Sequence, residues 1–457
     1  MKRVFFCLSL AFAIHANAQT FPGYSTGNYA GVAGIVSNPA SIADSRFRFD
    51  LNFFSLHGNF GADNISFDKK DLKSSVDGNY FFNQLKSGSA NAIAVADVLG
   101  PSFMFNTGKK SAIALSSRLR GVGNITNIDG SFAKQVSDGI ADGVGLPFNF
   151  SSDNNMRAHA NTWMEFGITY SRELYSEGSN FLKGGITLKY LGGIAGGQLR
   201  LDQLNGSLRE DVMSGQPYFA NTTGRIGVGF SRPDFDDPEA KLFNAGGLGA
   251  DIGLVYEFRP DAEEYSGNKK RNKYKLRIGA SVLDLGKLKS KKPDGQGGNY
   301  AIDVRGNERL NTDEFDELNL EDFNSFFLAR PQYFTPLTNI PVAYSFSLPT
   351  TMQVNLDYHL KGGIYLNLAG QLPLRKESDA KPYDNRFYSS LTITPRFENK
   401  GFGVYLPAQY SALTGFDMGA SLRMGPLFVG SASLLKTFTG RTKQADVQLG
   451  LKLSLYR

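Results

Sequence analysis

Apolar and polar side chains alternate along much of the chain with a period of two residues. From 447 to 455 every odd-numbered residue is Val or Leu, and the even-numbered residues are Gln, Gly, Lys and Ser. Successive side chains of a strand point to opposite faces, so the pattern predicts β-strands with one apolar and one polar face. The same alternation recurs at 47–53, 164–170, 248–258, 274–282 and 352–368.

Two architectures share this alternation. A soluble sandwich turns the apolar face inward, and a transmembrane barrel turns it outward to lipid. The predicted strands are about 10 residues or longer, which suits a tilted membrane crossing, and short connections alternate with long ones. The short ones are 106–110, 398–401 and 425–426, and the long ones 58–99, 122–161, 193–222 and 306–340.

We therefore predict an all-β fold, a transmembrane antiparallel β-barrel, with a soluble secreted β-protein as the alternative. In the last strand Leu451 and Leu453 are expected to face lipid. Lys452 is expected to face the lumen and to tolerate substitution by Ala.

Composition agrees with strands and turns. The 457 residues include 51 Gly, 36 Phe and 20 Tyr, and no apolar run of about 18 residues predicts a transmembrane helix. The net charge is only +6, without a dense basic patch, so we expect no nucleic acid partner.

The N-terminus has the features of a secretory signal peptide at 1–18. Lys2 and Arg3 precede an apolar stretch at 4–14, and Ala16-Asn17-Ala18 forms a cleavage site. We expect cleavage near Ala18 and insertion into the outer membrane of a Gram-negative cell. Cys7, the only cysteine, lies in the removed segment, which excludes disulfides and Cys-based metal sites.

Motifs of catalysis are incomplete. Gly23-Tyr24-Ser25-Thr26-Gly27 matches G-x-S-x-G but lacks the preceding strand of a nucleophile elbow. The three remaining histidines, His57, His159 and His359, are far apart, and the acidic cluster at 234–239 lacks calcium-loop spacing. We expect no catalytic residue, no metal, no cofactor and no enzyme.

Several short segments resemble a known group of proteins. They are Asn28–Val32, Asn38–Asp44, Ile278–Gly286, Leu348–Thr350 and Gly419–Leu427. They resemble an uncharacterised family of Gram-negative outer-membrane barrels, distantly similar to the long-chain fatty-acid transporter (FadL-like) superfamily. The resemblance implies about 14 strands with an N-terminal plug, whereas sixteen candidates are counted along the chain, including a short one around Tyr300. We expect 14–16 strands.

The expected organisation is a plug at 19–45 followed by the barrel at 46–457. Asn38 is a good N-cap and Pro39 suits the first helical position, so a short helix from Pro39 to about Asp44 is predicted. Asn38, Pro39 and Ala40 are the candidate plug residues. They either form a capped turn that seats the N-terminus in the lumen or take part in gating and ligand contact.

Two connections are predicted to contain helices. Phe132, Val136, Ile140 and Val144 recur every four residues. Asn311 can cap a second helix with Glu314 three residues on. Its apolar side includes Phe315, Phe323, Phe326 and Phe327. The helices either cover the barrel mouth or form an apolar ligand rim.

These features lead to two functional hypotheses. The first is an outer-membrane barrel that binds or translocates small hydrophobic molecules. The alternative is a non-transporting barrel that anchors or assembles surface or secretion components. The expected partners are outer-membrane lipid, a small hydrophobic ligand, and surface or secretion proteins.

Overall fold

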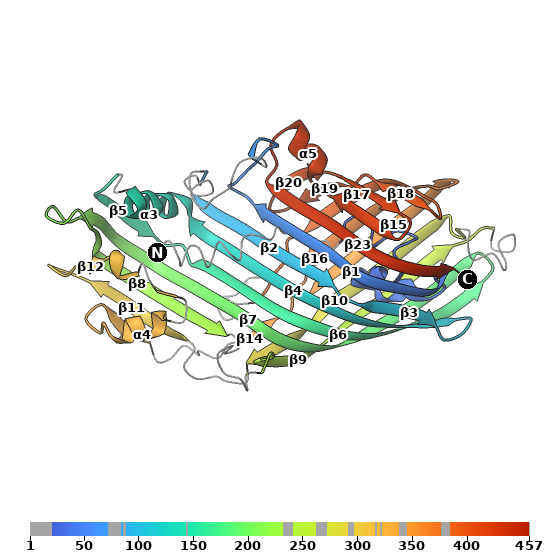
Figure 1. The fold of residues 1–457 in the computed structure, drawn as a ribbon, viewed down its shortest axis with the longest axis horizontal. Coiled ribbons are helices and arrows are strands. Elements are labelled where there is room, and N and C mark those ends of the chain that lie inside the picture. Colours follow the sequence, from blue (N-terminus) through green and yellow to red (C-terminus); the bar gives the residue numbers. More distant parts are fainter. Residues whose placement is uncertain are drawn as a thin grey trace.

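The strands of the computed structural model wind into a closed antiparallel barrel of fourteen strands, which confirms the predicted fold. The last strand segment, β23 (Gln444–Tyr456), closes the barrel on the first, β1 (Phe47–Ala62), and the strands cross the molecule obliquely (Figure 1). The structure describes residues 21–71, 84–85, 88–142, 145–231, 241–261, 272–290, 297–315, 318–319, 322–337, 345–375 and 384–456.

Many barrel strands consist of shorter segments in line, such as β2 and β3, which both pair with β1. The segments are β2 (Ser89–Leu99), β3 (Ser102–Asn106), β4 (Ser111–Asp129), β5 (Phe148–Ser152), β6 (Met156–Glu177), β7 (Asn180–Glu210), β8 (Pro217–Ser231), β9 (Ala245–Phe258), β10 (Leu276–Ser290), β11 (Gly297–Val304), β12 (Leu310–Asn311), β13 (Phe334–Pro336), β14 (Ser345–Ser347), β15 (Thr351–Lys361), β16 (Ile364–Pro373), β17 (Ser390–Glu398), β18 (Phe402–Tyr405), β19 (Ala408–Ser411), β20 (Gly415–Met418), β21 (Ala420–Met424) and β22 (Leu427–Ser431).

Interrupted strands explain why a count along the sequence exceeds fourteen. The short strand around Tyr300 is β11, which pairs with β8, while β10 pairs with β9. Because β8 and β9 both pair with the single long strand β7, β10 and β11 are two halves of one barrel strand.

The predicted long loop at 193–222 is wrong. β7 continues to Glu210 and forms a hairpin with β8. The glycines at 192, 193, 196 and 197 hide the apolar alternation in the sequence, although the backbone still pairs along the strand.

The two faces of the strands have the character expected of a membrane barrel. Ile168, Leu188 and Leu453 are 60%, 62% and 51% exposed on the outside, while Arg120 and Gln448 are buried inside. A soluble sandwich would show the opposite arrangement. Lys452 faces the lumen as predicted, but its ammonium lies 3.2 Å from Asp50, so tolerance to Ala is not expected from the structure.

Most tight turns lie at one end of the barrel, which also carries the longer connection 259–275 between β9 and β10. The turns at 107–110, 178–179, 362–363, 399–401 and 425–426 lie at the end where β1 starts and β23 stops; we call it the short-turn end. At the opposite, long-loop end, β5, β8, β11 and β12 gather with α3 (Gly130–Asp142) and α4 (Phe323–Leu328) (Figure 1).

The remaining helices are short. They are α5 (Leu434–Thr439) and the 3₁₀ helices η1 (Gly31–Val36), η2 (Pro39–Ile42) and η4 (Asp313–Phe315). Helix α3 confirms the predicted helix near 132–144, whereas the second predicted helix is divided into η4 and α4. No helix in the described part of the chain is long and apolar enough to cross a membrane.

Candidate functional site

Residues 21–46, the N-terminal segment, lie inside the barrel. Asn38 caps η2 as predicted, since its side-chain oxygen accepts a hydrogen bond from the Ala40 amide at 2.9 Å. The amide nitrogen of the same side chain donates to the carbonyls of Leu254 and Ala280 at 3.1 and 3.2 Å. One side chain therefore both starts the helix and binds the barrel wall on β9 and β10.

Two glycines make room for this contact. Gly185 on β7 and Gly253 on β9 are cross-strand partners. A Cβ on Gly185 would lie 2.5 Å from the carbonyl carbon of Pro39, and one on Gly253 would lie 2.2 Å from the Asn38 oxygen. Both distances are shorter than van der Waals contact, so the segment requires residues without a side chain here. We call this pair the glycine seat.

Inward side chains bind the carbonyl groups of the segment from several sides of the barrel. Because these donors come from distant strands, they hold the segment across the lumen rather than against one wall. The pairs are Ser171 to Ala40 at 3.2 Å, Lys183 to Ala43 at 2.8 Å, Ser281 to Ser37 at 2.7 Å, Gln448 to Pro22 at 3.1 Å and Lys452 to Tyr29 at 2.5 Å.

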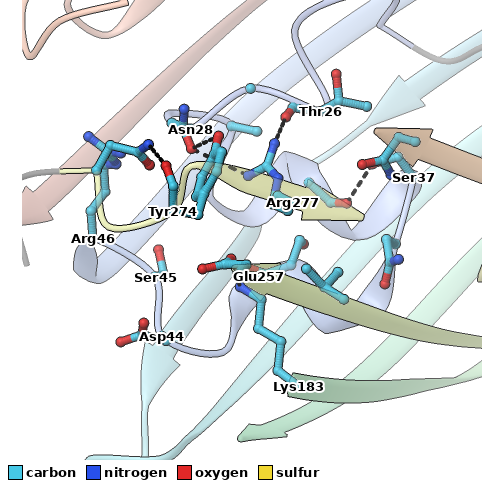
Figure 2. Close-up of a pocket in the computed structure, with 18 of the residues that line it drawn as sticks. Thr26, Asn28, Ser37, Asp44, Ser45, Arg46, Lys183, Glu257, Tyr274 and Arg277 are labelled. Carbon is cyan, nitrogen blue, oxygen red and sulfur yellow. Dashed lines mark hydrogen bonds and ion pairs between the residues drawn. The ribbon is translucent and has the colours of Figure 1, made fainter. Parts of the chain in front are cut away.

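A polar cavity of about 100 Å³ lies between the segment and β7, β9 and β10. Figure 2 shows Asn28 facing Tyr274 and Arg277 across it. Burial raises the pKa of the Tyr274 hydroxyl well above its usual value, so this group stays protonated and can donate to the Asp357 carboxylate or to the Asn28 side chain. Asp44 of the segment pairs with Arg259 at 2.9 Å and with Lys273 at 3.5 Å.

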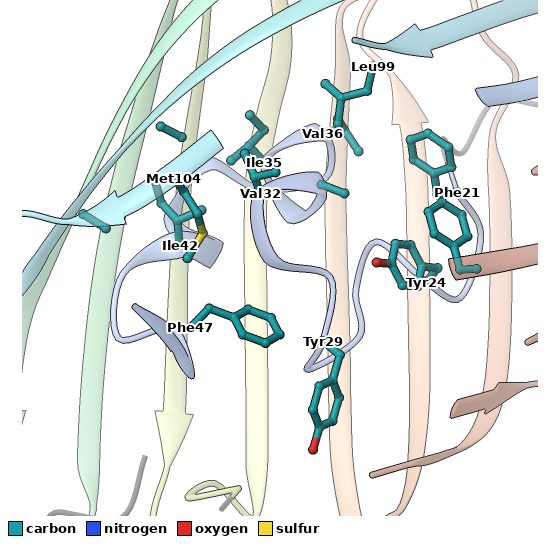
Figure 3. Close-up of a cluster of buried hydrophobic side chains, with 14 of the residues drawn as sticks. Phe21, Tyr24, Tyr29, Val32, Ile35, Val36, Ile42, Phe47, Leu99 and Met104 are labelled. Carbon is teal, nitrogen blue, oxygen red and sulfur yellow. The ribbon is translucent and has the colours of Figure 1, made fainter. Parts of the chain in front are cut away.

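The apolar side of the segment packs against the barrel wall. Phe21, Tyr24 and Val32 are almost fully buried and belong to one cluster with Met104 and Phe428 (Figure 3). The Tyr24 ring stacks on Phe428 with 3.9 Å between the ring centroids. Apolar and polar contacts together fix the segment in the half of the lumen near the short-turn end.

A chain of ion pairs crosses the inner wall beyond the segment. Arg120 lies 2.9 Å from Glu165 and 2.8 Å from Asp284, and Lys189 lies 2.8 Å from both Asp284 and Asp251. These groups come from β4, β6, β7, β9 and β10, and all are buried. Because charges buried in a lumen of this kind need partners, the chain neutralises groups that would otherwise destabilise the closed barrel.

An apolar cluster, which we call the lumen cluster, fills the barrel next to these charges. Its wall residues come from β2, β4, β6, β7, β9, β10 and β14, and connections add Leu348, Phe387 and Leu413. Trp163 is fully buried, donates to Glu165 at 2.8 Å and lies 5.1 Å from the Arg120 guanidinium. The buried members are Ile93, Val95, Val122, Trp163, Leu191, Ala245, Leu288, Phe346, Leu348, Phe387 and Leu413.

The loop that carries Phe387 is bound inside the barrel. Asn124 on β4 both donates to the Arg386 carbonyl at 3.1 Å and accepts from its amide at 3.2 Å. Asn161 on β6 donates to the Asn385 side chain at 2.7 Å. Phe387 thereby comes within 5.9 Å of the Arg120 guanidinium.

The predicted rim residues are placed together at the long-loop end. Phe323, Phe326 and Phe327 are 8%, 6% and 0% exposed in one cluster, against which Phe132 and Phe315 pack. Val136 is buried on α3. The side chain of Ile140, residue Val144 and the acidic cluster at 234–239 lie outside the described residues. The role of these residues in ligand contact stays a prediction.

Alternation did not identify the lumen cluster or the ion-pair chain. Arg118 and Arg120 occupy alternating polar positions of a strand, which is a local signal for the lumen face. Their carboxylate partners lie on strands far away in sequence, so the pairing has no local signal. Within the described residues, no group of three or more His, Cys, Asp or Glu side chains could hold a metal ion.

Comparisons with known proteins identify a family without assigning an activity. The model of a family described as "Family of unknown function (DUF5723)" matches residues 39–432. No curated protein matches the chain.

Solved barrels are similar over almost the whole chain. The toluene transporter TbuX of Ralstonia pickettii is 11% identical, with a TM-score of 0.42, over 96% of this chain and 100% of that chain. A FadL homologue of Pseudomonas aeruginosa is 9% identical, with a TM-score of 0.46, over 96% and 98%. The translocator domain of the autotransporter NalP from Neisseria meningitidis is 8% identical, with a TM-score of 0.33, over 96% and 100%.

Proposed function

The chain belongs to the family of unknown function DUF5723, and we propose that it is an outer-membrane barrel that binds small hydrophobic molecules and passes them when its N-terminal segment moves. The lumen cluster supports this proposal. Lumen-facing side chains of general pores are polar, whereas Val122, Leu191 and Leu288 here form an apolar patch of the lumen wall, separate from the apolar residues that pack against the N-terminal segment.

The N-terminal segment acts as a plug in this proposal. Asn38, Pro39 and Ala40 dock on the glycine seat, and carbonyl groups of the segment accept hydrogen bonds from Ser171 on β6 and from Gln448 on β23. These contacts are polar and reversible, because water can replace each hydrogen bond when the segment leaves. A hydrophobic molecule then passes between the lumen cluster and the short-turn end.

Trp163 provides the test, because it is the only tryptophan of the chain and belongs to the lumen cluster. Bromodecane, a heavy-atom quencher, should quench the fluorescence of the purified full chain in lipid vesicles, and the quenching should saturate. Aqueous iodide should quench weakly, since Trp163 is fully buried. Quenching that rises only in proportion to the bromodecane in the membrane would contradict a binding site.

A matched control separates lumen binding from membrane partitioning. In a variant that combines Trp163→Phe with Leu188→Trp, the single tryptophan moves to a position that is 62% exposed on the lipid side. Its quenching reports bromodecane in the membrane and should not saturate. Saturation at both positions would mean that the measurement does not report the lumen.

A second function, a scaffold for surface or secretion components, is favoured by one feature. The long-loop end carries a folded lobe in which β8, β11, β13 and α4 share an apolar core that includes Tyr300, Phe327 and Phe334. Such a lobe suits the binding of a protein. Absence of saturable quenching at Trp163 would favour this scaffold function.

We further propose that the protein lies in the outer membrane with its short-turn end toward the periplasm, as in known barrels of this class, and that its role is non-enzymatic. The full chain should fractionate with outer membranes, resist carbonate extraction and migrate faster unheated than boiled. Release into the soluble periplasmic fraction would contradict this location.

A further inference from the structure

Five inward side chains near the long-loop end form a group that we call the amide patch. Each is 0–2% exposed, and each has at least one polar atom without a hydrogen-bond partner among the described residues. Most buried polar groups in folded proteins are hydrogen-bonded, so such a concentration requires an explanation. The members are His57, Asn59, Gln409, Asp417 and Gln444.

The patch extends over β19, β20, β23 and β1, and β22 lies between β20/β21 and β23 in the sheet. Gln409 on β19 is the cross-strand partner of Asp417 on β20. Thr414, in the turn between them, donates to Gln444 on β23 at 3.2 Å. β23 in turn pairs with β1, which carries Asn59 and His57.

The amide patch directly adjoins the lumen cluster. Asn59 on β1 is the cross-strand partner of Val95 on β2, and Val95 is the partner of Val122 on β4. Both valines belong to the lumen cluster. The inner wall therefore changes from unpartnered polar groups to packed apolar groups between β1 and β2, so the lining is amphipathic.

Two loop residues occupy the apolar side of this lining. Phe387 and Leu413 are members of the lumen cluster that come from loops, as distinct from Leu348, which lies in the short stretch between β14 and β15. They contribute apolar groups only, so they pack on the wall without giving the amide patch a partner. The Phe387 and Leu413 side chains therefore cover the apolar part of this lining.

We propose that this amphipathic lining binds an uncharged molecule that has an apolar body and a hydroxyl group. This inference rests on the proposed function and specifies its ligand. In the described part of the chain, the side-chain nitrogen and oxygen of Asn59 and of Gln409 have no hydrogen-bond partner, so the patch offers donors as well as acceptors. A hydroxyl group can pair with both the donors and the acceptors of the patch, because it donates one hydrogen bond and accepts others.

The charge of the patch favours a hydroxyl over a carboxylate. One oxygen of Asp417 accepts from Thr442, and the other has no partner. The nearest cation described beside it, Lys436, is 4.0 Å away. A ligand carboxylate would meet this buried acidic group, whereas a hydroxyl can donate to its free oxygen.

Competition against the saturable bromodecane quenching of Trp163 tests the inference on the unmodified full chain. Decanol should displace bromodecane at a concentration roughly tenfold lower than decane or sodium decanoate does, as expected of one or two hydrogen bonds. Equal displacement by decane and decanol would overturn this inference and leave the proposed function intact. Absence of saturable quenching would instead contradict the proposed function itself.

Two separate variants locate the hydroxyl site. Asn59→Leu and Gln409→Leu should each reduce the preference for decanol over decane toward one, while decane still displaces bromodecane. Thr169→Val is the matched control, because Thr169 faces the lumen on β6 but already bonds Thr187 at 2.8 Å. Heat-dependent gel migration checks that both leucine variants fold. If both folded variants keep the full preference for decanol over decane, the assignment of the hydroxyl site to Asn59 and Gln409 is contradicted.

Discussion

At the scale of single residues, the alternation assigns the face of each strand position but not its energetic role. Leu453 and Lys452 face lipid and lumen as predicted. Lys452, however, binds Asp50 and the Tyr29 carbonyl of the N-terminal segment, and these partners lie 402 and 423 residues away in sequence. A period of two carries no information about such distant partners, so the expected tolerance of Lys452 to Ala could not be judged from the sequence.

The lipid-facing assignment can be tested on β23. Leu453→Arg should lower the free energy of unfolding by roughly 2–4 kcal/mol, because an arginine on the lipid face must be accommodated in the hydrocarbon layer. Leu455→Arg, which is also exposed but nearer the strand end, should cost less. Urea unfolding in lipid vesicles, followed by Trp163 fluorescence, measures both. An equal loss of unfolding free energy in the two variants would contradict the placement of Leu453 deeper in the hydrocarbon layer than Leu455.

The glycine seat provides a second prediction at this scale. Gly253→Ala should displace the N-terminal segment, because the new Cβ would overlap the Asn38 side chain. In an Ala33→Cys background, maleimide labelling should become roughly tenfold faster, which corresponds to about 1.4 kcal/mol of lost binding of the segment. Cys7 lies in the expected signal peptide, so the introduced cysteine would be the only thiol of the processed chain.

Gly370→Ala is the matched control for this experiment. Gly370 is also in a strand, but its nearest neighbour would lie 3.9 Å from an added Cβ. Labelling should therefore remain slow. Equal acceleration by both substitutions would mean that the barrel as a whole has loosened rather than that the segment has left its seat.

At the scale of elements, local sequence patterns predict where helices form better than they predict what those helices pack against. Spacing by four predicts α3, and the Asn311–Glu314 pair is present as a hydrogen bond of 3.3 Å from the Asn311 amide. The phenylalanines of α4 were expected to form an apolar rim or a cover. In the structure they pack on β11 and β13, whose positions depend on pairing with the distant strand β8.

Adjacent residues of α4 allow a direct test of this packing. Phe327 is fully buried and Leu328 is 55% exposed. Phe327→Asp should destabilise the lobe at the long-loop end by several kcal/mol, since it buries a charge without a partner. Leu328→Asp should change little. Limited proteolysis measures lobe stability, while heat-dependent gel migration should show an intact barrel in both variants.

At the scale of the whole molecule, the barrel was predictable because alternation repeats in every crossing strand. The number of strands was not fixed by that pattern, since interruptions such as that between β10 and β11 look like separate strands. Which strands share the ion-pair chain or the lumen cluster depends on closure of the barrel. Closure brings together residues that no local pattern connects.

Conductance tests whether the lumen is closed. The intact protein should conduct ions negligibly in planar bilayers, because the N-terminal segment fills one half of the lumen and the lumen cluster occupies a further level. Deletion of residues 19–45 should increase the conductance. Deletion of residues 212–214, in the turn between β7 and β8, removes exposed residues such as Val212 and should change nothing. A large conductance of the intact protein would contradict a plug.

The hydrogen bonds from β23 to the N-terminal segment also link the docking of that segment to closure of the barrel. Gln448 and Lys452 bind the Pro22 and Tyr29 carbonyls, and both donors belong to the strand that is synthesised last. The segment therefore acquires its complete set of contacts only when the final strand joins β1. Closure of the barrel and complete docking of the segment are therefore coupled, and a chain in which β23 has not joined β1 lacks two of the hydrogen bonds that hold the segment in the lumen.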